Sequence, residues 1–351
     1  SGCSRLFQRF PSTTQGRECR AVSTSRDVAK AAGVSVATVS RAFSEKAAVS
    51  SATRRHVLAV ADRLGYSPDP AARRLTTGRS GNIGLIVPDL SNPFFADVAK
   101  GVQRRARDRR RSIFISDTDE QARLEADAVR HLARQVDGII WASPRLSDEA
   151  LAELRPMVPV VLLHRSSPGW WSVTAEYREG MRQTLVNLHA LGHRTVAYAG
   201  GPAASWSGAQ RLDGLRTAAA DLAITLVELG SVAPTIDGGL AAADLVLATE
   251  ATALVAYNDA VGLGAMARLA ARGVKVPDDL SVVGCDDTML SRLTLPPMTT
   301  VNVPRYEAGD VALSLLEQQM ESPSDDPVAQ VLPTHLVIRG TTAPPPAKKG
   351  S

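Results

Sequence analysis

Apolar residues recur at helical spacing near the N-terminus, on both sides of a glycine. Gly33 permits a sharp reversal of the backbone, and Ser35 is a good N-cap for a second helix. The stretch 27–43 therefore predicts two short helices joined by a tight turn. Their inward positions are Val28, Ala29 and Ala32 in the first helix, and Val39, Ala42 and Phe43 in the second.

The outward face of the second helix combines hydroxyl groups, short apolar groups and one arginine. These residues are Ser35, Val36, Ala37, Thr38, Ser40 and Arg41. Hydroxyl groups suit phosphates, short apolar groups suit thymine methyls, and arginine can pair bidentately with guanine. The pattern therefore indicates a helix-turn-helix that enters a major groove, although an ordinary αα-hairpin would share its apolar spacing.

A third helix and a linker follow the pair. After a polar loop at 44–49, apolar spacing predicts a helix over 51–64 with Val57, Leu58, Ala61 and Leu64 buried. Residues 67–81 are expected to form a linker, within which 71–75 could make one or two helical turns that are too short to be stable alone.

From Asn82 onward, short apolar runs alternate with helical segments in two series. The predicted strands are 83–87, 112–116, 138–143 and 159–164 in the first series, and 172–175, 195–200, 224–229, 253–258 and 280–285 in the second. This alternation is typical of parallel sheets with helices on both faces, so two doubly wound lobes are expected. Ligands of such folds bind beyond the carboxyl ends of the strands, which predicts a cleft between the lobes.

Charge is distributed unevenly along the 351 residues. The net charge is +4, yet residues 24–80 carry 10 Lys/Arg against 4 Asp/Glu, so a basic head precedes an acidic body. That distribution is typical of a unit that binds a polyanion. Three cysteines without C-x-x-C spacing, and no apolar run long enough for a bilayer, favour a cytoplasmic protein without a metal or cofactor site.

Four long motifs occur in one order that resembles the lactose repressor / galactose repressor family of bacterial transcriptional regulators. They are DVAKAAGVSVATVSRAF at Asp27, LGYSPDPAARRLTTGRSGNIGLIVPDLSNPFF at Leu64, LGHRTVAYAGGP at Leu191, and VPDDLSVVGCDD with LPPMTTV at Val276 and Leu295. The resemblance implies an N-terminal three-helix helix-turn-helix headpiece and a bilobed, periplasmic-binding-protein-like α/β core. It also implies a homodimer on a pseudo-palindromic DNA operator, acting as a repressor of a small catabolic operon.

The resemblance assigns roles to individual residues. In DNA binding, Val36, Ala37 and Arg41 would read bases, and Ser35, Thr38 and Ser40 would hold the backbone. Tyr66, at the end of the headpiece, and Ala72 and Leu75, in the hinge, would also contact DNA, with Leu75 as a minor-groove wedge. Around a small effector, which is expected to be a sugar, it places Asp89, Phe94, Phe95, His164, Ser205, Trp206, Ser207, Arg211, Asn258 and Asp286. His164 stands where the family usually has an acid, which leaves the class of effector open.

The expected boundaries are 1–23 for a disordered extension, 24–66 for the headpiece, 67–81 for the hinge, 82–341 for the core and 342–351 for a disordered tail.

Two other classes of protein compete with the regulator. Gly262, Gly264 and Ala267 match the G-x-G-x-x-A pattern of a Rossmann-type dinucleotide-dependent enzyme, but they lie too far beyond the preceding strand. A solute-binding protein would share the core but would have a signal peptide and no basic head. The arginines at 104–111 could form a second nucleic-acid patch or a solvated helix face.

Overall fold

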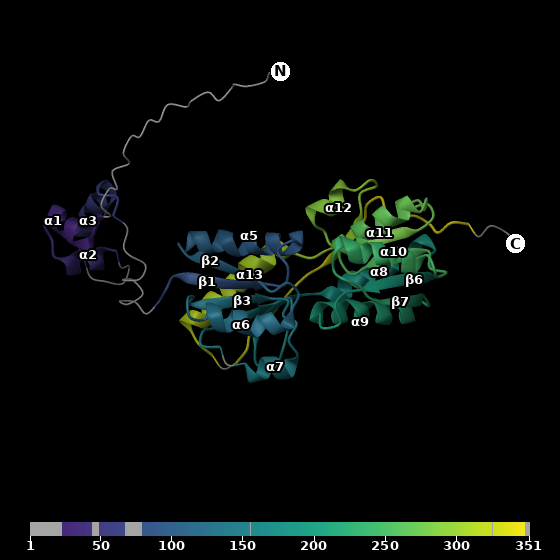
Figure 1. Ribbon diagram of the computed structural model, residues 1–351, viewed down its shortest axis with the longest axis horizontal. Coiled ribbons are helices and arrows are strands. Elements are labelled where there is room, and N and C mark those ends of the chain that lie inside the picture. The colour runs from purple at the N-terminus through teal and green to yellow at the C-terminus, as the bar shows by residue number, and fades with distance from the viewer. Residues whose placement is uncertain (1–22, 44–48, 67–78, 155, 325, 348–351) are drawn as a thin grey trace, which may run out of the picture. The chain divides into compact units, whose positions relative to one another are not determined.

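The computed structural model describes residues 23–43, 49–66, 79–154, 156–324 and 326–347. The chain divides into two compact units between residues 78 and 79 (Figure 1). Most of the expected hinge, including Ala72 and Leu75, lies outside the described residues, as does most of the loop before the third helix.

The first unit is the predicted three-helix headpiece. Its helices are α1 (Ser25–Ala32), α2 (Val36–Ala42) and α3 (Ser51–Arg63). Thr24 and Asp27 form a capping box at the start of α1, and Gly33 ends that helix in the left-handed conformation at φ 66°. Ser35 accepts a hydrogen bond from the Thr38 backbone N–H and caps α2. The expected helix-turn-helix is therefore present.

The predicted buried face of α3 was partly wrong. Val57 and Ala61 are buried as expected, but the third core position is Val60, while Leu58 and Leu64 remain 39% and 38% exposed. The helix ends at Arg63, so Leu64 is its C-cap and lies beyond the buried stripe. The small core shared with α1 and α2 accommodates only the i, i+3, i+4 set of α3.

Two six-stranded sheets form the second unit, as the fold class predicted. The first-lobe sheet has the order β11-β5-β4-β3-β1-β2 and the second-lobe sheet the order β12-β10-β9-β8-β6-β7. All pairs are parallel except β10 with β12. The first-lobe strands are β1 (Asn82–Val87), β2 (Ser112–Asp117), β3 (Gly138–Ala142), β4 (Val160–Leu163), β5 (Trp171–Ala175) and β11 (Ala329–Leu332). The second-lobe strands are β6 (Thr195–Gly200), β7 (Thr225–Ser231), β8 (Ala253–Ala256), β9 (Ser281–Asp286), β10 (Thr299–Asn302) and β12 (His335–Val337).

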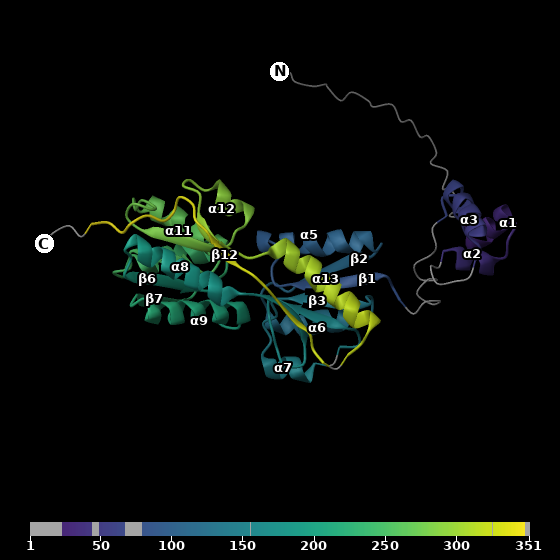
Figure 2. The same cartoon turned by 180° about the vertical axis from the view of Figure 1, so that it is seen from behind.

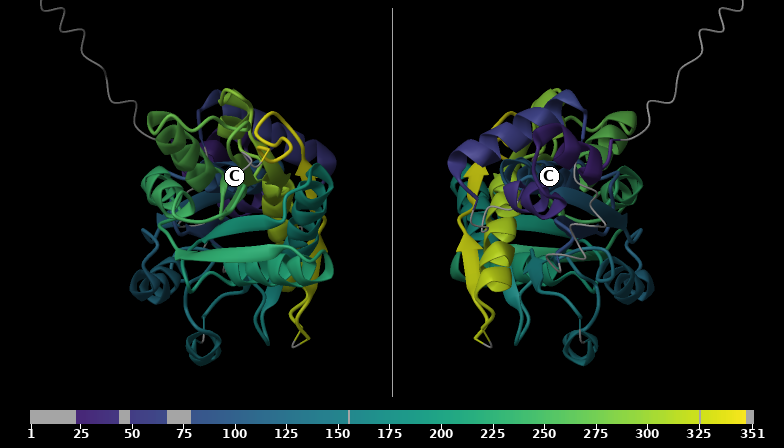
Figure 3. Two further views of the ribbon diagram at one scale, coloured as in Figure 1. Left: turned by 90° about the vertical axis from the view of Figure 1, so that its right-hand side faces the viewer. Right: turned by 90° about the vertical axis from the view of Figure 1, so that its left-hand side faces the viewer.

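Helices cover both faces of each sheet, and the layers are visible in Figures 1 and 3. The first lobe has α5 (Pro93–Asp108) and α13 (Arg305–Glu321) on one face, with α6 (Ala122–Leu132) and α7 (Asp148–Glu153) on the other. The second lobe has α8 (Tyr177–Leu191) and α9 (Trp206–Asp221) on one face, with α10 (Ile236–Val246), α11 (Asp259–Ala271) and the short α12 (Met289–Leu293) on the other. Buried aliphatic side chains fill each interface between sheet and helices.

The chain crosses between the lobes three times, which the sequence pattern did not reveal. Strand β5, which was expected to open the second lobe, instead pairs with β4 and completes the first-lobe sheet. The chain enters the second lobe at α8, returns to the first lobe at α13, and crosses again between β11 and β12 (Figure 2). Apolar periodicity identifies strands but not their sheet, so β5 was misassigned and β10 and β11 were missed.

Close packing of α10 on α11 explains Gly264, one of the two glycines of the apparent dinucleotide fingerprint, whereas a Cβ on the other, Gly262, would meet the Met298 sulfur at 2.7 Å. Gly264 lies inside α11, where a Cβ atom would stand 1.9 Å from the Ile236 carbonyl oxygen. A Cβ on Gly239 of α10 would stand 2.2 Å from the Val261 carbonyl oxygen. These glycines therefore allow two helix backbones to touch, as expected, and do not form a phosphate-binding turn.

The arginine-rich end of α5 packs against acids of α13. Arg105 contacts both Asp310 and Glu317, and Arg109 and Arg111 also lie within 3.8 Å of a Glu317 oxygen. Much of this cluster is therefore part of a helix–helix contact within the first lobe.

The C-terminal segment stays attached to the second lobe beyond residue 341. The Ala343 carbonyl oxygen lies 2.9 Å from Nε2 of His193 and accepts a hydrogen bond from the Ser281 hydroxyl at 3.2 Å. Among the described residues, no helix is long and apolar enough to cross a membrane.

Candidate DNA-binding helix and effector cleft

The expected DNA-contacting residues of α2 lie together on the outer face of the headpiece. Ser35, Val36, Ala37, Ser40 and Arg41 are exposed and Thr38 is half-buried, whereas Val39 and Ala42 face the core. Tyr66 lies elsewhere, with its ring against Phe43 at a centroid distance of 5.8 Å. The outer face of α2 is therefore exposed to solvent, and the Tyr66 ring packs on Phe43, the C-cap of that helix.

A narrow pocket, with a cavity volume of about 20 Å³, lies between the two lobes. Six of the predicted effector residues line it: Phe94, Phe95, Ser207, Arg211, Asn258 and Asp286. Seven further residues line the cavity but were not predicted as effector contacts: Asn92, Glu120, Ser143, Arg145, Tyr177, Pro234 and Tyr257. Aromatic rings, two guanidinium groups and two carboxyl groups thus surround one space.

Arg211 is the central cation of the second-lobe wall. One Nη donates to the Tyr257 carbonyl oxygen at 2.6 Å, and the other lies 3.5 Å from an Asp286 carboxylate oxygen. The guanidinium carbon lies 5.0 Å from the ring centre of Tyr177 and 4.7 Å from that of Tyr257. Its Nε is buried without a partner among the described residues, so the group has unused donor capacity.

Burial and the neighbouring Arg211 act on the pKa of Asp286 in opposite directions. Burial raises its pKa to about 7, although Arg211 favours the charged form. Beside it, Asn258 caps α11 through its side-chain oxygen and donates its amide to the Pro234 carbonyl oxygen at 3.1 Å. This wall therefore offers both donors and acceptors, which a polyhydroxyl ligand can use.

The first-lobe wall contains a second ion pair, between the buried Arg145 and the half-buried Glu120. Arg145 donates from Nε and one Nη to the two carboxylate oxygens of Glu120, at 2.7 and 3.0 Å. Glu120 follows β2 and Arg145 follows β3, each three residues beyond the strand end. Their position could have been predicted by applying the strand-end rule to every strand instead of only to some.

Glu125 and Arg165 hold the backbone of the loop that presents Arg145. The Glu125 carboxylate accepts hydrogen bonds from the backbone N–H groups of Arg145 and Leu146, the shortest at 2.8 Å. Arg165 donates to the carbonyl oxygens of Pro144 and Leu146. Burial raises the pKa of Glu125 to about 7 despite these donors.

Four of the predicted effector residues do not line the cavity. His164 is buried, with Nδ1 2.7 Å from the Tyr177 hydroxyl and its ring centre 4.9 Å from that of Phe94, and burial lowers its pKa to about 3. Ser205 caps α9 and lies 2.9 Å from the Tyr257 hydroxyl. Both residues therefore position the aromatic rings that line the cavity. Trp206 packs against the core, and Asp89 accepts a hydrogen bond from the Ser91 backbone N–H.

A three-helix headpiece joined to a two-lobed core with a polar cleft defines a ligand-responsive DNA-binding regulator. Comparison with known families agrees. Residues 24–69 match the family described as bacterial regulatory proteins, lacI family, and residues 186–342 match the periplasmic binding protein-like domain. Catabolite control protein A of Priestia megaterium is 33% identical over 90% of this chain and 98% of its own length. The repressor CytR of Escherichia coli strain K12 is 32% identical over 91% of this chain and 96% of its own length.

Solved structures agree with these relatives. The lac repressor dimer bound to operator and the anti-inducer ONPF superimposes with a TM-score of 0.81, at 30% identity over 92% of this chain and 100% of that one. The complex of the transcriptional regulator CelR with cellobiose gives a TM-score of 0.66, at 31% identity over 91% of this chain and 99% of that one. The chain belongs to the lacI family of bacterial regulatory proteins. It is a transcriptional regulator, and the Rossmann-type enzyme is set aside.

Proposed function

We propose that the protein is a homodimeric repressor that binds a pseudo-palindromic operator and responds to a sugar or sugar derivative in the interlobe cleft. In this proposal Val36, Ala37 and Arg41 read base edges, while Ser35, Thr38 and Ser40 hold phosphates. The proposal includes Tyr66, Ala72 and Leu75 as the hinge-side contacts, by resemblance to the family. Such a protein acts where the chromosome is, in the cytoplasm.

The observation that carries the effector proposal is the composition of the cavity wall. Arg211, Asn258 and Asp286 provide hydrogen-bond donors and acceptors within one space, beside the rings of Phe94 and Tyr257. Sugar hydroxyls both donate and accept, and the apolar faces of sugar rings pack on aromatic side chains. The ligands of the solved relatives, among them cellobiose and ribose, support the same class.

Exposed apolar side chains support the dimer. Leu293 and Leu295, on and just after α12, are 69% and 93% exposed, and Ile236 at the start of α10 is 53% exposed. Phe114 and Ile115 are also exposed on β2, the edge strand of the first-lobe sheet. Exposed apolar side chains on helices and on a sheet edge are typical of an interface that a second copy covers.

Thermal shift across a panel of pentoses, hexoses, disaccharides, sugar acids and sugar phosphates tests the effector proposal. A ligand at a hundred times its Kd stabilises the fold by about 2.7 kcal/mol, which is a readily measured rise in Tm. Arg211→Gln should abolish the shift. Arg216→Gln is the matched control, because Arg216 lies on the same helix but pairs with Glu228 at the surface. If the two variants respond alike to an active sugar, the cleft is not the binding site.

A further inference from the structure

The turn that begins at Asp286, the last residue of β9, carries the cleft carboxylate in an unfavourable backbone conformation. Asp286 and Asp287 are consecutive, and both have positive φ angles, of 123° and 54°. Residues other than glycine rarely adopt positive φ angles, so the surrounding contacts must hold the turn in place. Whatever holds Asp287 also fixes the direction of the Asp286 side chain.

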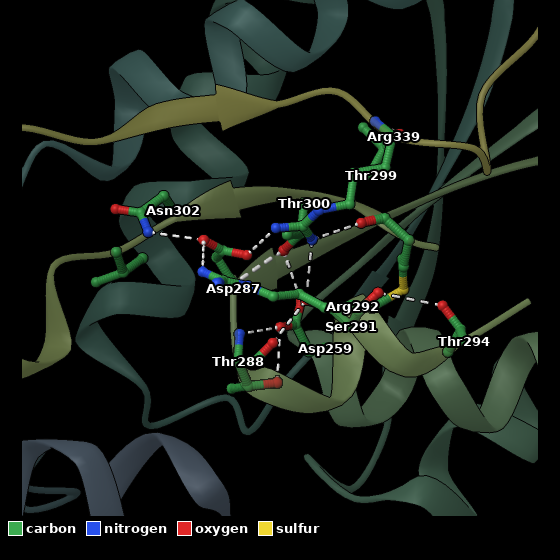
Figure 4. Close-up of polar contacts among 12 residues, drawn as sticks. Asp259, Asp287, Thr288, Ser291, Arg292, Thr294, Thr299, Thr300, Asn302 and Arg339 are labelled. Atoms are coloured by element: carbon green, nitrogen blue, oxygen red, sulfur yellow. Dashed lines mark hydrogen bonds and ion pairs between the residues drawn. The ribbon is translucent and has the colours of Figure 1, made fainter. Parts of the chain in front are cut away.

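The side chain of Asp287 is held within its own lobe (Figure 4). One carboxylate oxygen accepts a hydrogen bond from Arg339, and the other accepts from Asn302 at 2.9 Å and from Arg292 at 3.2 Å. The backbone N–H of Asp287 donates to the Thr300 hydroxyl at 3.3 Å. All four partners belong to the second lobe, so these contacts anchor the turn to that lobe alone.

The carbonyl oxygen of Asp287 has a partner of another kind. It accepts a hydrogen bond at 2.8 Å from Nη2 of Arg305, the first residue of the first-lobe helix α13. The Nε of the same guanidinium donates to the Asp97 carboxylate on α5 at 3.2 Å, and Nη1 donates to the Val303 carbonyl oxygen at 3.3 Å. The Arg305 side chain is only 12% exposed. One planar group therefore joins both lobes at the edge of the cleft.

We propose that Arg305 is a positioning residue for the cleft, which ties the turn bearing Asp286 to helix α5 of the opposite lobe. Helix α5 also begins with Phe94 and Phe95, so the bridge connects two walls of the same cavity. The bridge fixes the spacing of the lobes together with the placement of the Asp286 carboxylate. A change in lobe spacing must stretch or break the contact from Arg305 to Asp287.

The bridge predicts a specific difference between arginine and lysine. The guanidinium presents Nε and Nη2 in a fixed planar arrangement, and these atoms reach two acceptors on different lobes at once. A lysine keeps the charge but has one nitrogen on a flexible chain, so it cannot reproduce the arrangement. Loss of charge alone would be rescued by lysine, whereas loss of the bridge would not.

Interlobe distance measured by pulsed electron paramagnetic resonance tests the proposal without a ligand. Spin labels are attached to full-length protein at Asp127→Cys on α6 and Thr217→Cys on α9, two exposed sites on different lobes. Cys3 and Cys19 are replaced by serine, while the buried Cys285 is kept. Labelled chains are diluted with unlabelled ones so that only distances within one chain contribute.

We expect Arg305→Gln and Arg305→Lys each to raise the population with a changed interlobe distance by roughly tenfold. The reason is that losing a hydrogen bond to a charged group changes an equilibrium constant by about tenfold or more. Asp97→Asn should give a smaller change in the same direction, and it also serves if the Arg305 variants fold poorly. Arg292→Gln, which removes a charged contact to Asp287 from within the second lobe, should match the wild type. Unchanged distributions in the Arg305 and Asp97 variants would overturn the proposal, as would full rescue by lysine.

A second readout connects the bridge to effector binding, and this part rests on the proposed function. With any sugar that raises the Tm of the wild type, Arg305→Gln should weaken binding several-fold, because Asp286 loses its placement, while Arg216→Gln, which removes a surface ion pair with Glu228, should not. If no sugar raises the Tm, the proposed effector class fails, but the distance measurement still decides whether the bridge exists. An equal sugar affinity in both variants would remove the positioning role.

Discussion

Replacing Glu125 by glutamine should change how the stability of the first lobe depends on pH. The carboxyl group is buried beneath the loop that presents Arg145, and burial raises its pKa from 4.5 to about 7. An acid whose pKa is higher in the folded state favours folding in its protonated form. That stability is fully present below pH 4.5 and is lost as the pH rises through about 7.

The expected magnitude follows from the size of the pKa change. At roughly 1.4 kcal/mol per pH unit, the rise corresponds to about 3 kcal/mol of unfolding free energy lost between pH 4.5 and 8. Glutamine is neutral throughout and can still accept from the backbone N–H groups of Arg145 and Leu146. The variant should therefore gain about 2.5 kcal/mol relative to the wild type between pH 5 and pH 8.

Urea denaturation followed by tryptophan fluorescence is a suitable assay, because Trp141, Trp170 and Trp171 all belong to the first lobe. Asp259 and Asp286 also have raised pKa values, of about 6 and about 7, but their effects cancel in the difference between the two proteins. Parallel pH profiles would refute the reasoning. They would mean that the backbone donors stabilise the Glu125 carboxylate enough to offset its burial.

Three further predictions concern other parts of the chain. Gly264→Ala should destabilise the second lobe by at least about 2 kcal/mol in denaturation experiments, because its Cβ would meet the Ile236 carbonyl oxygen at 1.9 Å, and an unchanged midpoint would show that α10 and α11 can separate freely. Leu293→Asp should shift the protein to monomer in analytical ultracentrifugation, whereas a persistent dimer would place the interface elsewhere. Leu75→Ala should weaken operator binding far more than binding to random DNA, and equal losses on both DNAs would remove its proposed role as a wedge.

Local structure was predictable where a short segment determines its own conformation. The N-cap Ser35, the reversal at Gly33 and the exposed face of α2 all follow from spacing within a few residues, and the structure has each of them. The alternation of apolar runs with helices likewise predicted two parallel sheets. These features depend on sterics and periodicity, which the sequence expresses directly.

Long-range assembly was not predictable from the same patterns. Strand β5 reads like the start of a new series, yet its partners β4 and β11 lie in the first lobe, and β11 comes from more than 150 residues later. The contact from the Arg305 guanidinium to the Asp97 carboxylate joins segments far apart in the chain. No local pattern indicates such a contact, because it depends on where the chain returns to the first lobe at α13.

The distinction between residues that line the cavity and those behind it also required the structure. The resemblance to the family pointed to His164 and Ser205 as ligand contacts, but the first lies behind Tyr177 and the second behind Tyr257. Both residues were predicted to contact the ligand directly. The resemblance gives a position along the chain, but it does not tell whether the side chain reaches the cavity or lies behind its wall. Tyr177 and Tyr257 line the cavity, but only the structure shows that they lie in front of His164 and Ser205.

Selection of DNA from a random pool, performed with the wild type and with Arg41→Ala, tests the central claim most directly. The wild type should enrich a two-fold symmetric site. The variant should bind that site about 1 to 3 kcal/mol more weakly and lose preference at one base pair in each half-site. Arg63→Ala, which removes an exposed arginine from α3 in the same headpiece, should leave the preference unchanged. An identical base preference in the wild type and Arg41→Ala would contradict the assignment of the outer face of α2 as the surface that reads the operator.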